Sequence, residues 1–186
     1  MERVCMDGIM MIRQVLLHGL QISIKKSLYK TLRTKKVDKM TGESWKIYWN
    51  EYTADTYLYG SEILFHDKED VEFKNELMPP GTVVKRWYSK VNYQMKRVEP
   101  SLPIIDGEGR YQIELNVSAA QPEGLILKIV YYDRYDVEAG YQIVRGGSSK
   151  FQCPLKTYSY EVQLINAGAQ EFHFHSIIIK EITDEE

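Results

Sequence analysis

The sequence predicts an all-β protein, an antiparallel β-sandwich or jelly roll, preceded by a basic extension that is either helical or disordered. The first observation is a series of short apolar or alternating segments between residues 45 and 182, bounded by Gly, Pro, Asn or Asp. The second is that no helical pattern of convincing length separates these segments. Short strands with turn signals at nearly regular spacing are typical of sandwiches. A chain of 186 residues can bury one substantial core.

The extension, residues 1–44, differs from the rest in charge and periodicity. Four apolar residues follow the spacing of one helix face: Ile9, Ile12, Leu16 and Leu20. The net charge is +6 through residue 46 and −8 over the remainder, which ends in an acidic tail at 183–186. Three interpretations stay open: the extension binds an anionic membrane surface, it is a solvated tail, or it is an upstream stretch joined to a domain that begins near Met40.

The extension predicts neither a membrane span nor a cleaved signal peptide. Arg13, Gln14 and His18 interrupt its apolar stretch, whereas a span needs about 20 nearly uncharged residues. The stretch also runs into lysines instead of the small residues of a cleavage site. The two cysteines, Cys5 and Cys153, cannot form a disulfide framework. We therefore expect a cytoplasmic protein.

Eight segments of residues 45–182 are predicted to be strands. In chain order they are "WKIYW" (45–49), "YLYGSEILF" (57–65), "TVVKRWYS" (82–89), "YQIELNVSA" (111–119), "LILKIVYYD" (125–133), "YQIV" (141–144), "YSYEVQLIN" (158–166) and "EFHFHSIIIK" (171–180). The fourth and seventh alternate apolar with polar residues, so each has one wet face. The fifth is apolar on nearly both faces, as expected of a central strand. Pro79 and Pro80 cannot donate to a ladder, so we expect their loop to cross an edge.

The last segment requires a change of face. Phe172 and Phe174 are expected in the core, which turns the histidines between and after them toward solvent or a groove. Ile177 and Ile179 share the parity of the histidines, yet their chemistry favours burial. A β-bulge or local break near Ser176 is therefore predicted.

The H-x-H pair, His173 and His175, is expected to be exposed or structural, with no metal. A zinc or copper site needs at least one further ligand, and His66, Cys153 and Asp133 lie at no diagnostic spacing. A metal-binding cupin-like protein is the third functional alternative. Cupins place an acid and a distant third histidine after this motif, and no histidine follows His175 here.

Other chemistry is not predicted. The chain lacks a G-x-S-x-G nucleophile motif, and "GGSSK" at 146–150 reads as a hairpin turn without phosphate-loop spacing. Cys153 stands before Pro154, where a small buried residue is the common explanation. The acidic balance of the sandwich disfavours nucleic acid as a partner. We therefore predict no catalytic residue and no cofactor.

Aromatic residues gather in the first half of the sandwich. Such rings fill cores, stack on sugars, or anchor partner proteins, and all three uses stay open. The candidate residues for binding a partner or a glycan are Tyr57, Tyr59, Trp87, Tyr88 and Tyr93.

Five segments carry a resemblance to a known family. They are "NEYTADTYLYGSEILF", "VEFKNELMPPGTVVKRWYS", "PSLPIIDGEGRYQIELNV", "LILKIVYYDR" and "YEVQLINAGAQEFHFHSIIIKE". In order and spacing they resemble the third of the three accessory secretory proteins of the accessory Sec system in Gram-positive bacteria. The match spans roughly residues 45–182. The motifs "YLYGS", "LMPPG" with its downstream Trp, and "LINAG" followed by F-x-F are specific together and weak singly.

The resemblance implies a non-enzymatic component of a dedicated export route. Members work in the cytoplasm at the membrane, in a complex with the first and second accessory secretory proteins. They assist the accessory SecA motor and SecY channel in exporting serine-rich repeat adhesins, whose preproteins and glycans are further expected contacts. The family fold resembles a carbohydrate-binding module, a β-jelly roll. A free-standing carbohydrate-binding module is the alternative function.

Overall fold

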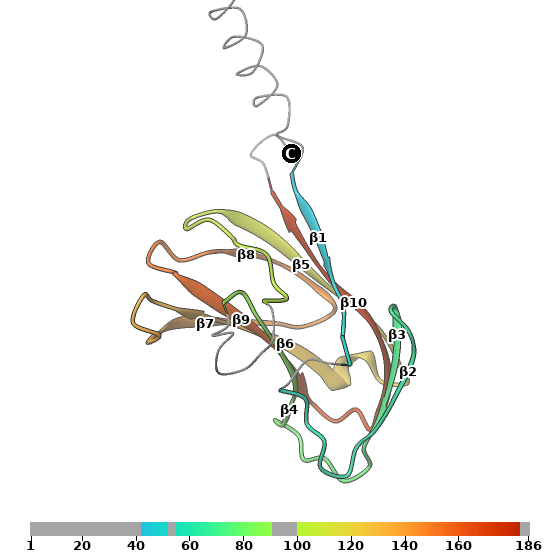
Figure 1. Ribbon diagram of the computed structural model, residues 1–186. Helices are drawn as coiled ribbons and strands as arrows, with labels where there is room; N and C mark the ends of the chain where they lie inside the picture. Colours follow the sequence, from blue (N-terminus) through green and yellow to red (C-terminus); the bar gives the residue numbers. More distant parts are fainter. Residues whose placement is uncertain (1–41, 52–54, 91–99, 183–186) are drawn as a thin grey trace, which may run out of the picture. The chain divides into compact units, whose positions relative to one another are not determined.

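The computed structural model describes residues 42–51, 55–90 and 100–182, and they form two antiparallel sheets (Figure 1). The strands are β1 (Ser44–Ile47), β2 (Glu62–Asp67), β3 (Asp70–Lys74), β4 (Val83–Tyr88), β5 (Arg110–Ala119), β6 (Leu125–Tyr132), β7 (Glu138–Val144), β8 (Ser148–Gln152), β9 (Ser159–Asn166) and β10 (Glu171–Glu181), with a 3₁₀ turn at Pro122–Gly124. Within these described ranges no helix is long and apolar enough to cross a membrane. The predicted antiparallel β-sandwich is confirmed.

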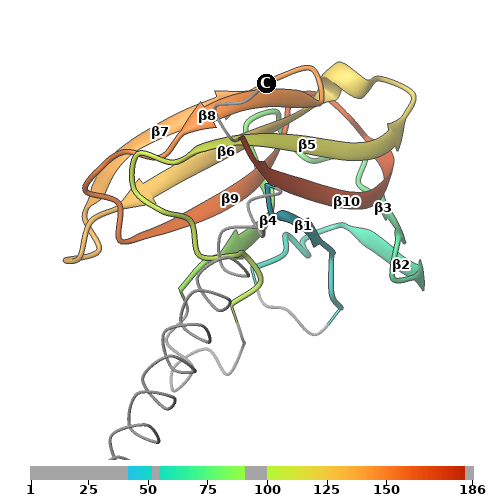
Figure 2. The same ribbon diagram turned by 90° about the horizontal axis from the view of Figure 1, so that it is seen from above.

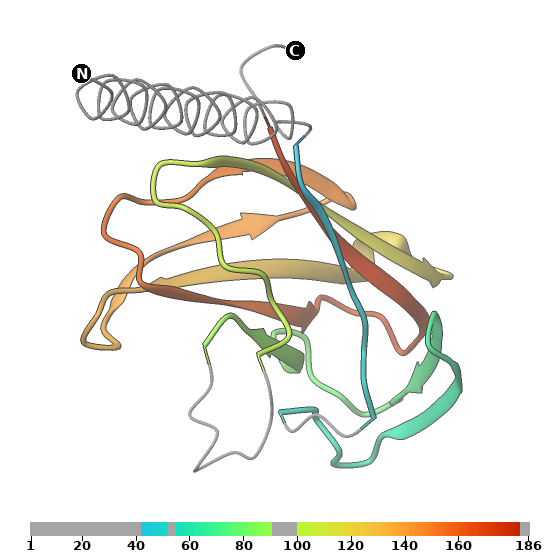
Figure 3. The ribbon, with the colours of Figure 1, turned by 45° about the horizontal axis from the view of Figure 1, so that its top comes forward.

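Strand β10 organises the larger sheet, whose order is β2-β3-β10-β5-β8. One edge of β10 pairs with β5 along its length, and the other edge is shared. Residues 171–174 pair with β3, and residues 177–180 pair with β1. Figure 3 shows β10 crossing the molecule beside β1. The first described strand, β1, is thereby paired with the last one, β10.

The smaller sheet has the order β4-β9-β6-β7 and packs against the larger one (Figure 2). Strands β6 and β9 pair over eight residues each, from Leu125↔Asn166 to Tyr132↔Ser159. Strand β6 therefore has neighbours on both edges, as its nearly continuous apolar sequence predicts.

An aromatic cluster between the sheets forms the centre of the core. The Trp49 ring lies 6.0 Å from Phe73, 5.6 Å from Phe174 and 6.2 Å from Trp87, measured between ring centroids. The Trp87 ring stacks on Phe174 at 5.4 Å, and its Nε1 donates a hydrogen bond to the Tyr48 carbonyl at 3.0 Å. These rings are buried, so burial of apolar area is the main stabilising contribution here.

The change of face in β10 occurs where the sequence predicts it. The pairing with β5 shifts between Phe174 and Ser176, which leaves His175 as the extra residue of a β-bulge. Phe174 before the bulge and Ile177 after it are both fully buried. The bulge therefore lets one strand present phenylalanines and then isoleucines to the same core.

Three local predictions differ from the structure. The segment predicted as one strand at 57–65 contains a turn at Tyr59–Gly60, so β2 begins only at Glu62. Strands β3 and β8 were not among the predicted strands, because each carries only one or two apolar residues among charged or polar ones. "GGSSK" is a turn only at its two glycines and then begins β8. Strands β3 and β8 are therefore fixed more by pairing with β10 and β5 than by their own sequence pattern.

A lysine lies inside the apolar core. Lys85 of β4 has 0% exposure, and its Nζ donates a hydrogen bond to Thr56 Oγ1 at 2.8 Å. The Nζ also lies 5.9 Å from the centre of the Trp49 ring. Burial lowers the pKa of Lys85 from 10.5 to about 8, although the nearby Asp55 carboxylate opposes this shift.

Replacing Trp87 by alanine should lower the free energy of unfolding by about 3–5 kcal/mol, because it leaves a large cavity beside Trp49 and Phe174. Equilibrium denaturation in urea measures this change. Tyr59→Ala is the control: this ring is 84% exposed, so its loss should change stability by less than about 0.5 kcal/mol. An unchanged urea midpoint for Trp87→Ala would contradict the core assignment.

The buried lysine predicts a pH dependence of stability. Its pKa is about 8 in the folded chain and 10.5 when unfolded, so between these values the unfolded chain binds more protons. The unfolding free energy should therefore rise by about 2 kcal/mol from pH 7 to 9.5. Lys85→Met should remove this rise. Ionisation of tyrosines in the unfolded chain begins to oppose this rise near pH 9.5, because burial raises the pKa of Tyr131 and Tyr160 in the folded chain. The difference between wild type and Lys85→Met isolates the contribution of the lysine, and parallel pH curves for the two proteins would contradict the prediction.

Candidate docking surface

One end of the sandwich is built from three loops joined by two buried asparagines. The loops are the turn at 58–61, the β3–β4 connection at 75–82 and the β9–β10 loop at 167–170. The asparagines are Asn75, 3% exposed, and Asn166, 2% exposed. Buried amides need partners for both donors and acceptors, so each fixes the backbone around it.

Asn75 joins the first loop to the second. Its Nδ2 donates to the Tyr59 carbonyl and to Ser61 Oγ, each at 2.9 Å. Its Oδ1 accepts a hydrogen bond from the Leu77 amide at 3.0 Å, and its own backbone amide donates to the Gln170 carbonyl at 2.8 Å. One residue therefore contacts segments of all three loops.

Asn166 joins the second loop to the third. Its Nδ2 donates to the Met78 carbonyl at 3.2 Å, and its Oδ1 accepts from the Gly168 amide at 2.9 Å. Its backbone carbonyl accepts from the Gly81 amide at 2.7 Å. Gly81 and Gly168 have φ of +90° and +128°, a region that favours glycine. Pro79 and Pro80 lie in the β3–β4 connection and in no strand, as predicted.

The three motifs that carry the family resemblance meet at this end. "YLYGS" spans 57–61, "LMPPG" spans 77–81 and "LINAG" spans 164–168. Asn75 bonds the first to the second, and Asn166 of the third bonds the second. Motifs that are far apart in the sequence therefore form one structural unit.

This unit presents three large apolar side chains to solvent. Leu58 is 70% exposed, Tyr59 is 84% exposed and Leu77 is 90% exposed. We name these three residues the Leu77 patch. Solitary exposed apolar side chains are ordinary, but these three lie on two loops whose backbones are joined by hydrogen bonds of the buried Asn75. Their exposure contributes little to folding, which favours a role in binding.

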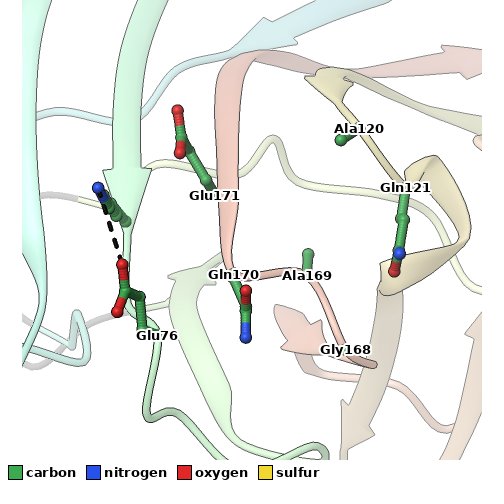
Figure 4. Close-up of a pocket in the computed structure, with 8 residues that line it drawn as sticks. Glu76, Ala120, Gln121, Gly168, Ala169, Gln170 and Glu171 are labelled. Atoms are coloured by element: carbon green, nitrogen blue, oxygen red, sulfur yellow. Dashed lines mark ion pairs between the residues drawn. The ribbon is translucent and has the colours of Figure 1, made fainter.

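A polar hollow adjoins the same loops. Its volume is about 440 Å³, and its lining comes from the end of β3, the β5–β6 connection and the start of β10. Figure 4 shows the carboxylates of Glu76 and Glu171 on one side and the Gln121 amide on the other. Glu76 forms an exposed ion pair with Lys74 at 3.9 Å. Such groups could satisfy the polar rim of an interface around an apolar centre.

The predicted binding residues do not form one site. Tyr59 lies in the Leu77 patch, whereas Tyr57 is half-buried and packs against the core. Tyr88 is half-buried at the end of β4, where burial raises its pKa. Trp87 is 1% exposed and offers no surface to a partner, so its role as a direct binding residue is corrected to a core role. Tyr93 lies outside the described residues.

Leu58, Leu77 and the two asparagines were not among the predicted binding residues. A weak local signal existed, because Leu58 and Leu77 lie in turn segments with Gly or Pro, but Met78 of the second segment is buried. The asparagines gave no such signal, because only long-range contacts reveal that they are buried.

Asn75→Ala should lower the free energy of unfolding by about 1–3 kcal/mol, since it leaves buried backbone groups without partners. The Leu77 amide, which donates to Asn75, should also exchange with deuterium faster. Urea denaturation and hydrogen exchange measure the two effects. The control is Asn116→Ala, because Asn116 is half-buried and its amide donates one hydrogen bond, to Ser176 Oγ at 3.2 Å. Equal effects of both substitutions would contradict the assigned role.

Comparisons with known proteins identify the family. A family model described as Accessory Sec secretory system ASP3 matches residues 56–181. A curated accessory Sec system protein from Streptococcus gordonii is 36% identical over 149 residues, covering 75% of this chain and 94% of the relative. One from Staphylococcus aureus is 27% identical over 144 residues, but the chain spans only 45% of its length.

Two solved structures agree. A crystal structure of accessory secretory proteins 1, 2 and 3 from Streptococcus pneumoniae matches at 33% identity and a TM-score of 0.71, covering 74% of this chain and 96% of that one. The Glycosylation Associate Protein (Gap123) complex from Streptococcus agalactiae matches at 33% identity and a TM-score of 0.72, covering 76% and 45%. The chain belongs to the Accessory Sec secretory system ASP3 family.

Proposed function

We propose that this chain is a non-enzymatic adaptor of the accessory Sec system and that it docks another accessory secretory protein through the Leu77 patch. The observation that carries the proposal is the exposure of Leu58, Tyr59 and Leu77 on loops fixed by Asn75 and Asn166. The family motifs meet at the same place. An adaptor needs a rigid surface, and this end provides one.

The energetics of the patch support docking. Burying one leucine or aromatic side chain contributes about 1.5–3 kcal/mol, so three such residues can form the centre of an interface. The loops are already ordered by hydrogen bonds, which reduces the entropy lost on binding. The adjoining hollow adds polar groups that can pair at the rim.

The partners proposed are the first and second accessory secretory proteins. Support comes from the solved structure of a relative, which contains accessory secretory proteins 1, 2 and 3. We propose that the accessory SecA motor and the serine-rich repeat preprotein, with its glycans, are reached through this complex. The family resemblance supports these further contacts.

The absence of catalysis is also a proposal. Cys153 is 1% exposed, as expected of a small buried residue, and burial raises the pKa of its thiol. A raised pKa makes the thiol a poor nucleophile. The family is named for an accessory role in secretion, which agrees with an adaptor.

We propose a cytoplasmic location and a division at residue 45. Residues 45–182 act as the sandwich, and the basic extension, 1–44, either contacts an anionic membrane surface at the inner face or is dispensable. The charge difference between the two parts supports the first use of the extension. The extension lies almost wholly outside the described residues.

Leu77→Asp should weaken binding to a purified complex of the first and second accessory secretory proteins at least tenfold, because a charge replaces an apolar anchor. Titration calorimetry of the full chain measures the dissociation constant. The matched control is Leu155→Asp, 68% exposed and located before β9, at the other end of that strand from Asn166.

Both variants should keep the wild-type urea midpoint, since both side chains are exposed. Equal affinity of Leu77→Asp and wild type would contradict docking through this patch. Failure of the wild-type chain to bind that complex at all would instead contradict the proposed partners.

A further inference from the structure

The outer face of the larger sheet holds a second cluster of functional groups, away from the Leu77 patch. His173 of β10 pairs with Glu72 of β3, and Asp70 lies two residues earlier in β3. The β2–β3 pairing shifts between Phe65 and Asp67, so His66 is the extra residue of that hairpin. The hairpin therefore brings His66 and Asp70 to His173.

The cluster has metal-ligating geometry. His173 Nδ1 lies 2.8 Å from Asp70 Oδ1, and His66 Nε2 lies 2.9 Å from Glu72 Oε2. The two imidazole rings are stacked, with centroids 6.2 Å apart and an angle of 13° between planes. One ligand atom from each of His66, Asp70 and His173 lies within 4.8 Å of the others.

We propose that His66, Asp70 and His173 form a binding site for a divalent transition metal of the zinc type. A ligand set of two imidazoles and a carboxylate favours zinc over calcium and magnesium, which prefer oxygen ligands. Ligands at about 2.0–2.1 Å in a tetrahedron lie roughly 3.3 Å apart. The ligand atoms, which lie within 4.8 Å of one another, need to converge by up to about 1.5 Å, which partly exposed groups on a hairpin can do. Glu72 can complete the set as a fourth ligand.

The charge around the cluster favours a cation. Of the nearby acids, Glu69 is paired with Lys46 at 2.8 Å, and the Asp67 carboxylate accepts a hydrogen bond from the Glu69 amide at 2.6 Å. Asp70 and Glu72 face the two histidines. The site thus favours positive charge.

The neighbouring histidine is excluded from the cluster by the β-bulge. His175 Nδ1 lies 2.8 Å from the Glu69 carbonyl, and its Nε2 lies 2.8 Å from Ser118 Oγ. Both ring nitrogens therefore have protein partners. The two histidines of the H-x-H motif have different roles, and His175 serves as a matched control.

Folding alone gives little reason for this convergence. The two histidine–carboxylate pairs are partly exposed, and exposed ion pairs contribute little to stability. A bound ion would join β10 to a hairpin 103 residues away in sequence, counted from Asp70 to His173. Ligand binding to the folded state alone then raises stability by mass action.

The test is titration of the full, untagged chain with zinc chloride after chelator treatment and dialysis, by calorimetry, with metal analysis of the dialysed protein. We expect one zinc per chain and a zinc-dependent rise in the melting temperature. His66→Ala and His173→Ala should each weaken zinc binding at least tenfold and abolish that rise. His175→Ala should bind zinc as the wild type does.

Asp70→Asn is the second ligand variant, which keeps the shape of the side chain and guards against loss of folding in the histidine variants. Circular dichroism and the metal-free urea midpoint establish that each variant is folded. Wild type that binds no zinc, or His66→Ala and His173→Ala that bind it as tightly as His175→Ala, would overturn the site. Zinc binding lost only in Cys5→Ser would assign the ion to the extension and overturn it too.

Discussion

The pairing of β10 on both of its edges is the constraint on which the rest of the structure depends. Along one edge it pairs with β5, and along the other with β3 and then β1. The bulge at His175 turns the second half of the strand by one residue, so that both halves present apolar side chains to the core. Without that extra residue, either Phe174 or Ile177 would face solvent, and the core would lose a fully buried side chain.

The same strand sets the positions of the two surfaces proposed for binding. Its first residue follows the loop that Asn166 and Asn75 hold in place, and its third residue, His173, faces the β2–β3 hairpin. Buried amides fix one surface through hydrogen bonds with defined geometry, while the other remains partly open to solvent. The loops held by asparagines and the partly exposed cluster around His173 therefore lie within a few residues of each other along the chain.

The sequence predicted those features that arise from local alternation. The sandwich, the central position of β6, the burial of Cys153 and the change of face near Ser176 all follow from period and composition, and all are confirmed. Strand β3 alternates over only five residues, which is a weak local signal, and its place beside β10 depends on pairing with a distant segment. The burial of Asn75 likewise depends on contacts with distant loops. Trp87 is a predicted binding residue that the structure buries, because composition alone does not tell which face a ring takes.

The first and last described residues of the sandwich lie at the same corner. The Glu181 amide donates to the Glu43 carbonyl at 2.9 Å, so Gly42 and Ile182 flank adjacent strands. The other end of this 11-residue strand adjoins the asparagine-held loops, a span of roughly 35 Å. The described chain thus enters and leaves the sandwich at one end, and the loops proposed for docking lie at the other. A partner docked on those loops would therefore leave uncovered the corner where Gly42 and Ile182 lie beside each other.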